Sequence, residues 1–195
     1  MSEIIQFTVS IKGSKPLIWR TFFVNRETSF FELHHILQIV MGWTNSHLFE
    51  FNLDGYRVGM IDEKEVQFGS SQVLDSRKTL LTDILSLERD YFQYKYDFGD
   101  GWVHEITLDK LVKRENKTLY PRCFGGEMNC PPEDCGGIKG FYSLLNILQD
   151  KKNPGYKEMK LWLGKKYNPG NYDVVKVNKQ LKQLKNYISK WNSPE

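Results

Sequence analysis

The sequence has no long hydrophobic run and few cysteines. Its apolar stretches are short, such as residues 36–41, whereas a helix that crosses a bilayer needs roughly 18 apolar residues. Residues 1–4 do not start a basic segment followed by an apolar one, so no secretory signal is expected. We therefore expect a cytoplasmic protein without a membrane partner. Three cysteines in that setting predict free thiols or metal ligands instead of a disulfide framework.

The sequence also lacks the short motifs that mark several large enzyme classes. It contains no H-E-x-x-H, no G-x-S-x-G and no G-x-x-x-x-G-K-S/T, and no G-x-G-x-x-G follows a strand pattern. These absences argue against zinc peptidases, serine hydrolases, P-loop nucleotidases and dinucleotide-binding enzymes of the usual kinds.

Composition and charge indicate a folded protein with one asymmetric feature. Of 195 residues, 40% are hydrophobic and 14% aromatic, which is enough to bury a core. The net charge is only +3, but residues 1–150 carry −5 and residues 151–195 carry +8. Such an asymmetry is typical of a surface that meets nucleic acid or an acidic partner, and also of ordinary solvated amphipathic helices.

The N-terminal half reads as strands around one early helix. Alternating apolar residues over 5–11 predict a half-buried strand, and residues 18–24 predict its return. Ser29 and Glu32 fit a capping box, and Gly42 is placed to end the helix that follows. A further strand is expected over 47–53, with His47 on its apolar face. Residues 54–78 should be loops with one short strand, and 80–87 should form one or two helical turns.

The second half begins with a hairpin and ends in helices. Residues 91–98 and 102–111 predict two strands around a Gly-Asp-Gly turn. Residues 113–137 have no periodicity and predict a long loop. Helices are expected over 138–150, 156–166 and 177–191.

This order of elements predicts an α+β fold with a mainly antiparallel, roll-like sheet, one early helix and a C-terminal helical segment. We expect a single domain over residues 1–195. Residues 1–137 would form its strand-rich core, and residues 138–195 a lysine-rich helical part packed on that core.

Two segments concentrate residues that could carry chemistry, namely 96–104 and 130–137. Carboxylates, glycines and histidines in tight turns form either an acidic pocket for Mg²⁺ or Ca²⁺ or an acid–base pair. The alternative is structural, because short carboxylates cap turns and buried histidines have hydrogen-bond partners. The candidate pocket residues are Asp97, Asp100, Trp102, His104, His47, Glu50, Glu133 and Asp134.

The cysteines suggest a zinc site. Cys123, Cys130 and Cys135 are spaced C-x6-C-x4-C, and only the second interval fits a zinc knuckle. His104, or His47, would complete a site that organises the long loop. The alternative is that the cysteines are small buried thiols.

The C-terminal lysines alternate with aromatic residues, a mixture that suits stacking on bases and contact with phosphates. Amphipathic helices that pack their aromatic residues on the sheet explain the same pattern. The candidate nucleic-acid contacts are Lys160, Lys165, Lys166, Lys179 and Lys182.

Four segments together resemble the Ri-plasmid open-reading-frame-three-like family: Ile18-Trp19-Arg20, residues 41–51, residues 96–104 and residues 130–137. Members of that family are sometimes labelled TnpR-like or resolvases. The resemblance covers residues 4–175 and implies a single α+β roll-like domain. It brings no established activity, cofactor or catalytic residue. A serine recombinase needs a nucleophilic serine among arginines, and the arginines here are few and scattered.

We therefore expect a binding module without enzymatic activity, associated with mobile-element or nucleic-acid transactions, with nucleic acid or an acidic protein as partner. Two alternatives stay open. One is a metal-dependent, hydrolase-like enzyme that uses the histidine, cysteine and carboxylate cluster. The other is a zinc ion, the one cofactor the sequence suggests, with a purely structural role.

Overall fold

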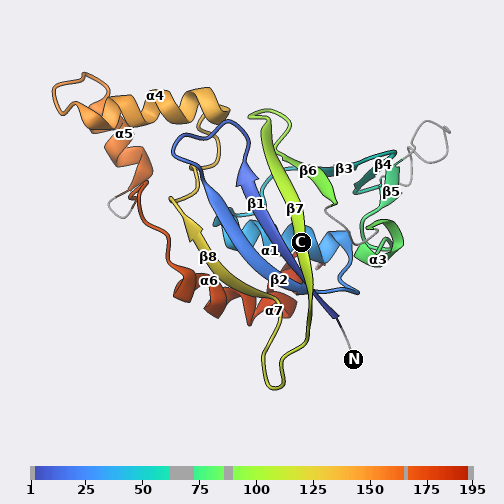
Figure 1. Ribbon diagram of the computed structural model, residues 1–195. Helices are drawn as coiled ribbons and strands as arrows, with labels where there is room; N and C mark the ends of the chain where they lie inside the picture. The colour runs from blue at the N-terminus through green and yellow to red at the C-terminus, as the bar shows by residue number, and fades with distance from the viewer. Residues whose placement is uncertain (1–2, 62–72, 86–89, 165–166, 193–195) are drawn as a thin grey trace.

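An eight-stranded sheet forms the frame of the protein (Figure 1). The computed structural model describes residues 3–61, 73–85, 90–164 and 167–192. The strands run in the order β5-β4-β3-β6-β7-β1-β2-β8, and every neighbouring pair is antiparallel except β4 and β5. Their bounds are Glu3–Ile11 (β1), Trp19–Asn25 (β2), Phe49–Leu53 (β3), Tyr56–Gly59 (β4), Val73–Asp75 (β5), Tyr91–Tyr96 (β6), Trp102–Lys113 (β7) and Arg122–Glu127 (β8).

The helices lie mainly behind the sheet and beyond one end of it (Figure 1). They are Phe30–Met41 (α1), Leu81–Ile84 (α3), Gly137–Gln149 (α4), Tyr156–Leu163 (α5), Val174–Leu181 (α6) and Leu184–Asn192 (α7). Within the described ranges, none of them is both long enough and apolar enough to cross a membrane. The predicted α+β class with a mainly antiparallel sheet is confirmed.

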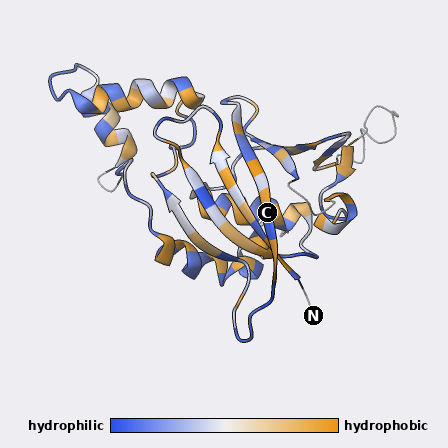
Figure 2. Ribbon diagram, in the orientation of Figure 1, coloured by the Kyte–Doolittle hydropathy of each residue, from blue (hydrophilic) through white to orange (hydrophobic). Residues whose placement is uncertain are grey.

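Alternation along the strands separates a buried face from a wet one. Ile5, Phe7 and Val9 of β1 are buried against α1, whereas Thr8 faces outward and donates to Asp109 at 2.7 Å. Figure 2 shows the resulting alternation of hydrophobic and hydrophilic residues along β1, β2 and β7. Helices cover one face of the central strands, so apolar and polar residues alternate along them. This alternation is what identifies the strands in the sequence.

Helix α1 lies at the centre of the core. The Ser29 hydroxyl accepts from the Glu32 amide while Glu32 reaches back to the Ser29 amide, and Gly42 ends the helix with φ of 95°. All of its residues except Glu32 are buried. Val177, Leu181 and Leu184 of α6 and α7 join the same core, whereas α5 has no buried residue.

Three predicted elements differ from the structure. Residues 122–127 belong to β8 instead of a loop, because β2 offers an open edge that no local periodicity reveals. The helix expected over 177–191 is two helices, with a turn at 182–183. The segment 54–78 supplies two short strands, β4 and β5, and its residues 62–72 lie outside the described ranges.

A buried arginine joins three parts of the fold. Arg20 of β2 is fully buried, so its guanidinium must find acceptors inside the protein. It donates to the carbonyl oxygens of Val40, Glu127 and Met128 at 2.9, 2.7 and 2.8 Å, and to its neighbour in β2. The carbonyl of Val40 lacks a helical partner because it lies in the last turn of α1. The ring of Tyr172 stacks on the guanidinium at 3.8 Å.

We predict that Arg20→Lys lowers the free energy of unfolding by about 3 kcal/mol, because an ammonium cannot reach three separated carbonyls and leaves buried acceptors unpaired. Urea denaturation measures the change. Arg122→Lys, on an exposed arginine of β8, is the matched control and should stay within about 0.5 kcal/mol of the wild type. If both variants were equally stable, the guanidinium would not hold these segments together.

Candidate functional site

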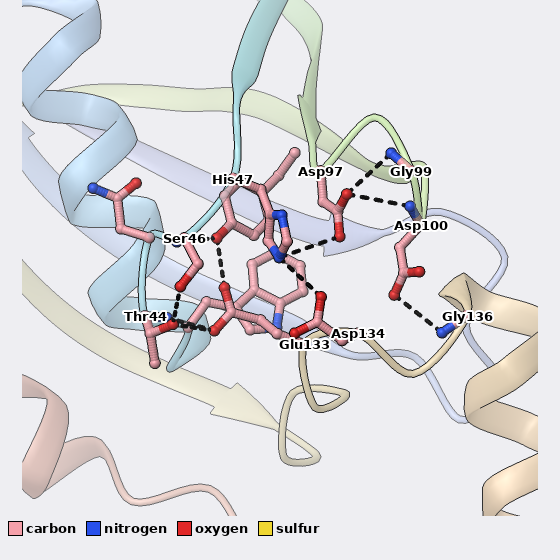
Figure 3. Close-up of polar contacts among 12 residues, drawn as sticks. Thr44, Ser46, His47, Asp97, Gly99, Asp100, Glu133, Asp134 and Gly136 are labelled. Atoms are coloured by element: carbon pink, nitrogen blue, oxygen red, sulfur yellow. Dashed lines mark hydrogen bonds and ion pairs between the residues drawn. The ribbon is translucent and has the colours of Figure 1, made fainter.

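Three turns meet at one end of the sheet (Figure 3). They are the segment before β3, the β6–β7 turn, and the loop that leads into α4. Each turn holds one residue other than glycine with positive φ: Asn45 at 63°, Asp97 at 55° and Asp134 at 60°. Such conformations cost of order 1 kcal/mol each and tend to gather at functional sites.

Asp97 stabilises the β6–β7 turn and also contacts the segment before β3. Its Oδ1 accepts from the amides of Gly99 and Asp100 at 3.0 and 3.3 Å, as predicted for a carboxylate in a tight turn. Its own amide donates to the Leu48 carbonyl at 2.9 Å, which ties this turn to the segment before β3. Its Oδ2 points toward His47 (Figure 3).

His47 lies between two carboxylates. Its Nε2 is 3.6 Å from Asp97 Oδ2 and 3.1 Å from Asp134 Oδ1. This nitrogen is shielded from solvent and forms no hydrogen bond with either oxygen. The prediction that His47 lies on the apolar face of a strand was wrong. The strand begins at Phe49, because the backbone turns at Asn45 and directs the imidazole to the turn region.

Glu133 anchors the third turn. Its carboxylate accepts from the Thr44 amide at 2.9 Å, from the Thr44 hydroxyl at 2.5 Å and from the Tyr96 hydroxyl at 2.5 Å. Burial, followed by the adjacent Glu133 charge, raises the pKa of Tyr96, so this tyrosine stays a neutral donor. Since Glu133 is occupied by these bonds, it positions its neighbour Asp134.

Asp100 links the β6–β7 turn to α4. Its Oδ2 accepts from the Gly136 amide at 3.1 Å, next to the start of that helix. A Cβ on Gly137 would lie 2.3 Å from the Asp100 carbonyl oxygen, and its φ is 66°. Only glycine permits this approach, which brings Asp134 to the turn that carries Asp97.

The ligand atoms of His47, Asp97 and Asp134 lie within 4.8 Å of one another. In a tetrahedral site with bonds of about 2.1 Å, neighbouring ligand atoms are about 3.4 Å apart. The separations around His47 Nε2 fall close to that value. Among the histidine, cysteine, aspartate and glutamate side chains of the described residues, His47, Asp97 and Asp134 are the group whose ligand atoms have the spacing of a metal site.

The structure does not bring the three cysteines together with His104. The Cys123 sulfur lies 3.0 Å from the Tyr172 hydroxyl, between β8 and the C-terminal part. Cys130 is buried, and that burial raises the pKa of its thiol. Burial also raises the pKa of Cys135 to about 12. The predicted zinc site is therefore not formed in the described structure, because these side chains are packed as separate neutral thiols.

His104 and Trp102 lie in the core beneath the turns. His104 is fully buried, as strand alternation predicted, and its Nδ1 donates to the Tyr94 carbonyl at 3.2 Å. Burial lowers the pKa of His104 to about 3, so the ring is neutral. Glu50 lies apart from the three-residue group and pairs with Arg57.

The candidate lysines do not gather into one described surface. Lys160 is exposed on α5, Lys179 is exposed on α6, and Lys182 follows α6. Lys165 and Lys166 lie outside the described residues. Contact with nucleic acid stays a prediction.

The sequence interpretation missed a buried polar network that fixes the first turn. His34 Nδ1 accepts from the Tyr94 hydroxyl at 2.7 Å, and its Nε2 donates to Asn45 Oδ1 at 2.5 Å. Gln38 donates to Tyr94 at 3.0 Å and accepts from the Asn45 amide at 3.0 Å. Burial lowers the pKa of His34 well below its usual value. Polar residues on the apolar side of a helix were the available signal, since they need partners.

Comparison with known proteins gives three matches. A family model described as plasmid pRiA4b ORF-3-like protein matches residues 3–176. The uncharacterized protein y4hQ of Sinorhizobium fredii (strain NBRC 101917 / NGR234) is 30% identical over 192 residues, covering 98% of this chain and 95% of that protein. The crystal structure of a protein of unknown function, MM3350 from Methanosarcina mazei Go1, is 31% identical with a TM-score of 0.83, covering 90% of this chain and 97% of that chain.

The buried histidines predict a pH dependence of stability. His104 and His34 are neutral in the folded protein but bind protons below about pH 6.5 when unfolded. The unfolded state then holds more protons, so stability falls as pH drops from about 6.5 toward the folded pKa values. His104→Leu should reduce the slope between about pH 5 and 6.5 by up to about 1.4 kcal/mol per pH unit.

Urea denaturation at several pH values measures this slope, whatever the absolute stability of the variant. Tyr91→Phe, on an exposed tyrosine of β6, is the control and should keep the wild-type slope. Equal slopes for the wild type and His104→Leu would contradict a neutral buried imidazole.

Proposed function

This chain belongs to the plasmid pRiA4b ORF-3-like family. From the residues of its own candidate site, we propose that it is a metal-dependent hydrolase whose divalent cation is bound by His47, Asp97 and Asp134. All three residues lie inside the region 3–176 that the family model matches. The proposal departs from a binding module without enzymatic activity and takes up the alternative that the sequence left open.

The observation that carries the proposal is the shielded Nε2 of His47, which makes no hydrogen bond and lies between two carboxylate oxygens. A nitrogen without a hydrogen bond is costly to bury, and a cation bound to its lone pair would remove that cost. Mixed imidazole and carboxylate ligands suit Mn²⁺, Fe²⁺ or Zn²⁺ better than Ca²⁺ or Mg²⁺.

Three protein ligands favour a catalytic site over a structural one, because they leave a coordination position for water. A divalent cation held by these residues would lower the pKa of that water, to about 7 in the case of zinc, and would so supply hydroxide near neutral pH. Such a hydroxide would add to a carbonyl carbon, the bond from that carbon to the leaving group would break, and the leaving group would depart with a proton.

Asp100 is the candidate proton acceptor. It lies in the same turn as Asp97, and one of its oxygens is held by Gly136. Its other oxygen makes no hydrogen bond within the described residues. In this role Asp100 would take the proton of the bound water and later pass it to the leaving group.

We predict that the wild-type protein binds one equivalent of Mn²⁺ or Zn²⁺, measured by isothermal titration calorimetry. Asp97→Asn and Asp134→Asn should each weaken binding by about 100-fold or more, since each removes a charged ligand. Asparagine at position 97 keeps the oxygen that caps the turn, so this variant should melt near the wild-type temperature. Asp109→Asn, on the outer face of the sheet, is the control and should bind normally.

The same titrations decide against the proposal if the wild type binds neither metal, or binds it no better than Asp97→Asn.

Metal-dependent release of p-nitrophenolate from p-nitrophenyl acetate tests the reaction. Asp100→Asn should lower kcat by about 100-fold or more and leave the metal affinity unchanged. Hydrolysis that persists in Asp97→Asn would place the reaction elsewhere in the protein.

A further inference from the structure

A hollow of about 480 Å³ opens directly beside the proposed metal ligands. His47 and Asp97 contribute to its wall, so a molecule bound there would reach the cation that these residues hold. The lining residues come from three elements: the segment before β3, the β6–β7 turn and α7. They are Asn45, Ser46, His47, Leu48, Asp97, Phe98, Gly99 and Trp191.

Three large apolar side chains surround this hollow and are open to solvent. Leu48 is 63% exposed, Phe98 is 58% exposed and Trp191 is 46% exposed. A single exposed apolar residue is ordinary, but three from separate elements around one hollow form an apolar surface next to a polar centre. Pockets that bind small molecules have this composition, with apolar walls and a few polar groups that fix orientation.

The charge around the hollow argues against a phosphate-rich ligand. Asp97 is the acidic residue among those that line the hollow, and Asp134, Asp100 and Glu133 lie in the turns beside it. A divalent cation would leave these four carboxylates with a net charge of −2. None of the eight lining residues is a lysine or arginine. Within the described structure, no lysine or arginine forms an ion pair with those four carboxylates. A polyanion would therefore be repelled here.

We infer that the site takes a small molecule in which an aromatic ring adjoins an uncharged carbonyl group, such as an aryl amide or aryl ester. The inference rests on the proposed metal site and adds its substrate class. Phe98 and Trp191 contact the ring, and the cation binds the carbonyl oxygen. Hydrolysis then breaks the bond between the carbonyl carbon and its leaving group, with water as the co-reactant.

Two metal-binding probes that differ only in the ring test this inference. Benzohydroxamate and acetohydroxamate carry the same chelating group, so the ratio of their Kd values for the metal-loaded protein isolates the contribution of the ring. We expect benzohydroxamate to bind about tenfold tighter or better, from the apolar area that its ring buries. Calorimetry with the Mn²⁺- or Zn²⁺-loaded protein measures both.

Variants of the apolar wall complete the test. The double variant Phe98→Ala with Trp191→Ala should bring the ratio close to one while leaving acetohydroxamate affinity and metal affinity unchanged. Phe124→Ala, on an exposed phenylalanine of β8, is the matched control and should keep the wild-type ratio. A short single-stranded DNA added at low salt should not displace benzohydroxamate.

The outcomes separate the inference from the proposed function. If metal and acetohydroxamate bind but benzohydroxamate binds no tighter, the aromatic substrate class is wrong and the metal site stands. Displacement by DNA would likewise overturn the substrate class. If the protein binds no metal and neither hydroxamate, the proposed function is wrong and the inference falls with it.

Discussion

The guanidinium of Arg20 is the constraint on which the arrangement of the site depends. Because this charge is taken fully out of water, it must keep its carbonyl acceptors at hydrogen-bond distance. Two of those acceptors lie where site segments begin. Val40 precedes the turn that carries His47, and Met128 precedes the loop that carries Asp134. One buried cation on β2, beside the edge strand β8, therefore fixes where both segments begin.

A second set of buried polar groups fixes the position of the turns relative to the core. The network of His34, Gln38 and Tyr94 holds Asn45 in its positive-φ conformation. Glu133 holds the opposite turn through Thr44 and Tyr96. A fully satisfied network specifies one geometry, because any other arrangement would leave buried polar atoms unpaired. These hydrogen bonds within the protein place the carboxylates around His47, and a bound cation is not needed to hold the turns in position.

The chemistry proposed for this site follows from charge and access. Within the described residues, the four carboxylates form no ion pair with lysine or arginine, which favours a divalent cation. The apolar rim formed by Leu48, Phe98 and Trp191 favours an uncharged ring over a phosphate backbone. The fold shared with MM3350 and the sequence similarity to y4hQ extend the same architecture to other chains. Neither description states an activity, so the function proposed here rests on the residues of this chain.

The sequence alone determined the elements whose signals are local. Alternation specified β1, β2, β6 and β7, and the Ser29 capping box and Gly42 specified α1. It also singled out the two turn segments that hold Asp97 and Asp134. Only the tertiary structure decided that His47 joins them and that Cys123, Cys130 and Cys135 stay apart. It alone showed that residues 122–127 form a strand. These outcomes depend on which segments meet across the fold, and contacts between distant residues leave no period or spacing in the chain.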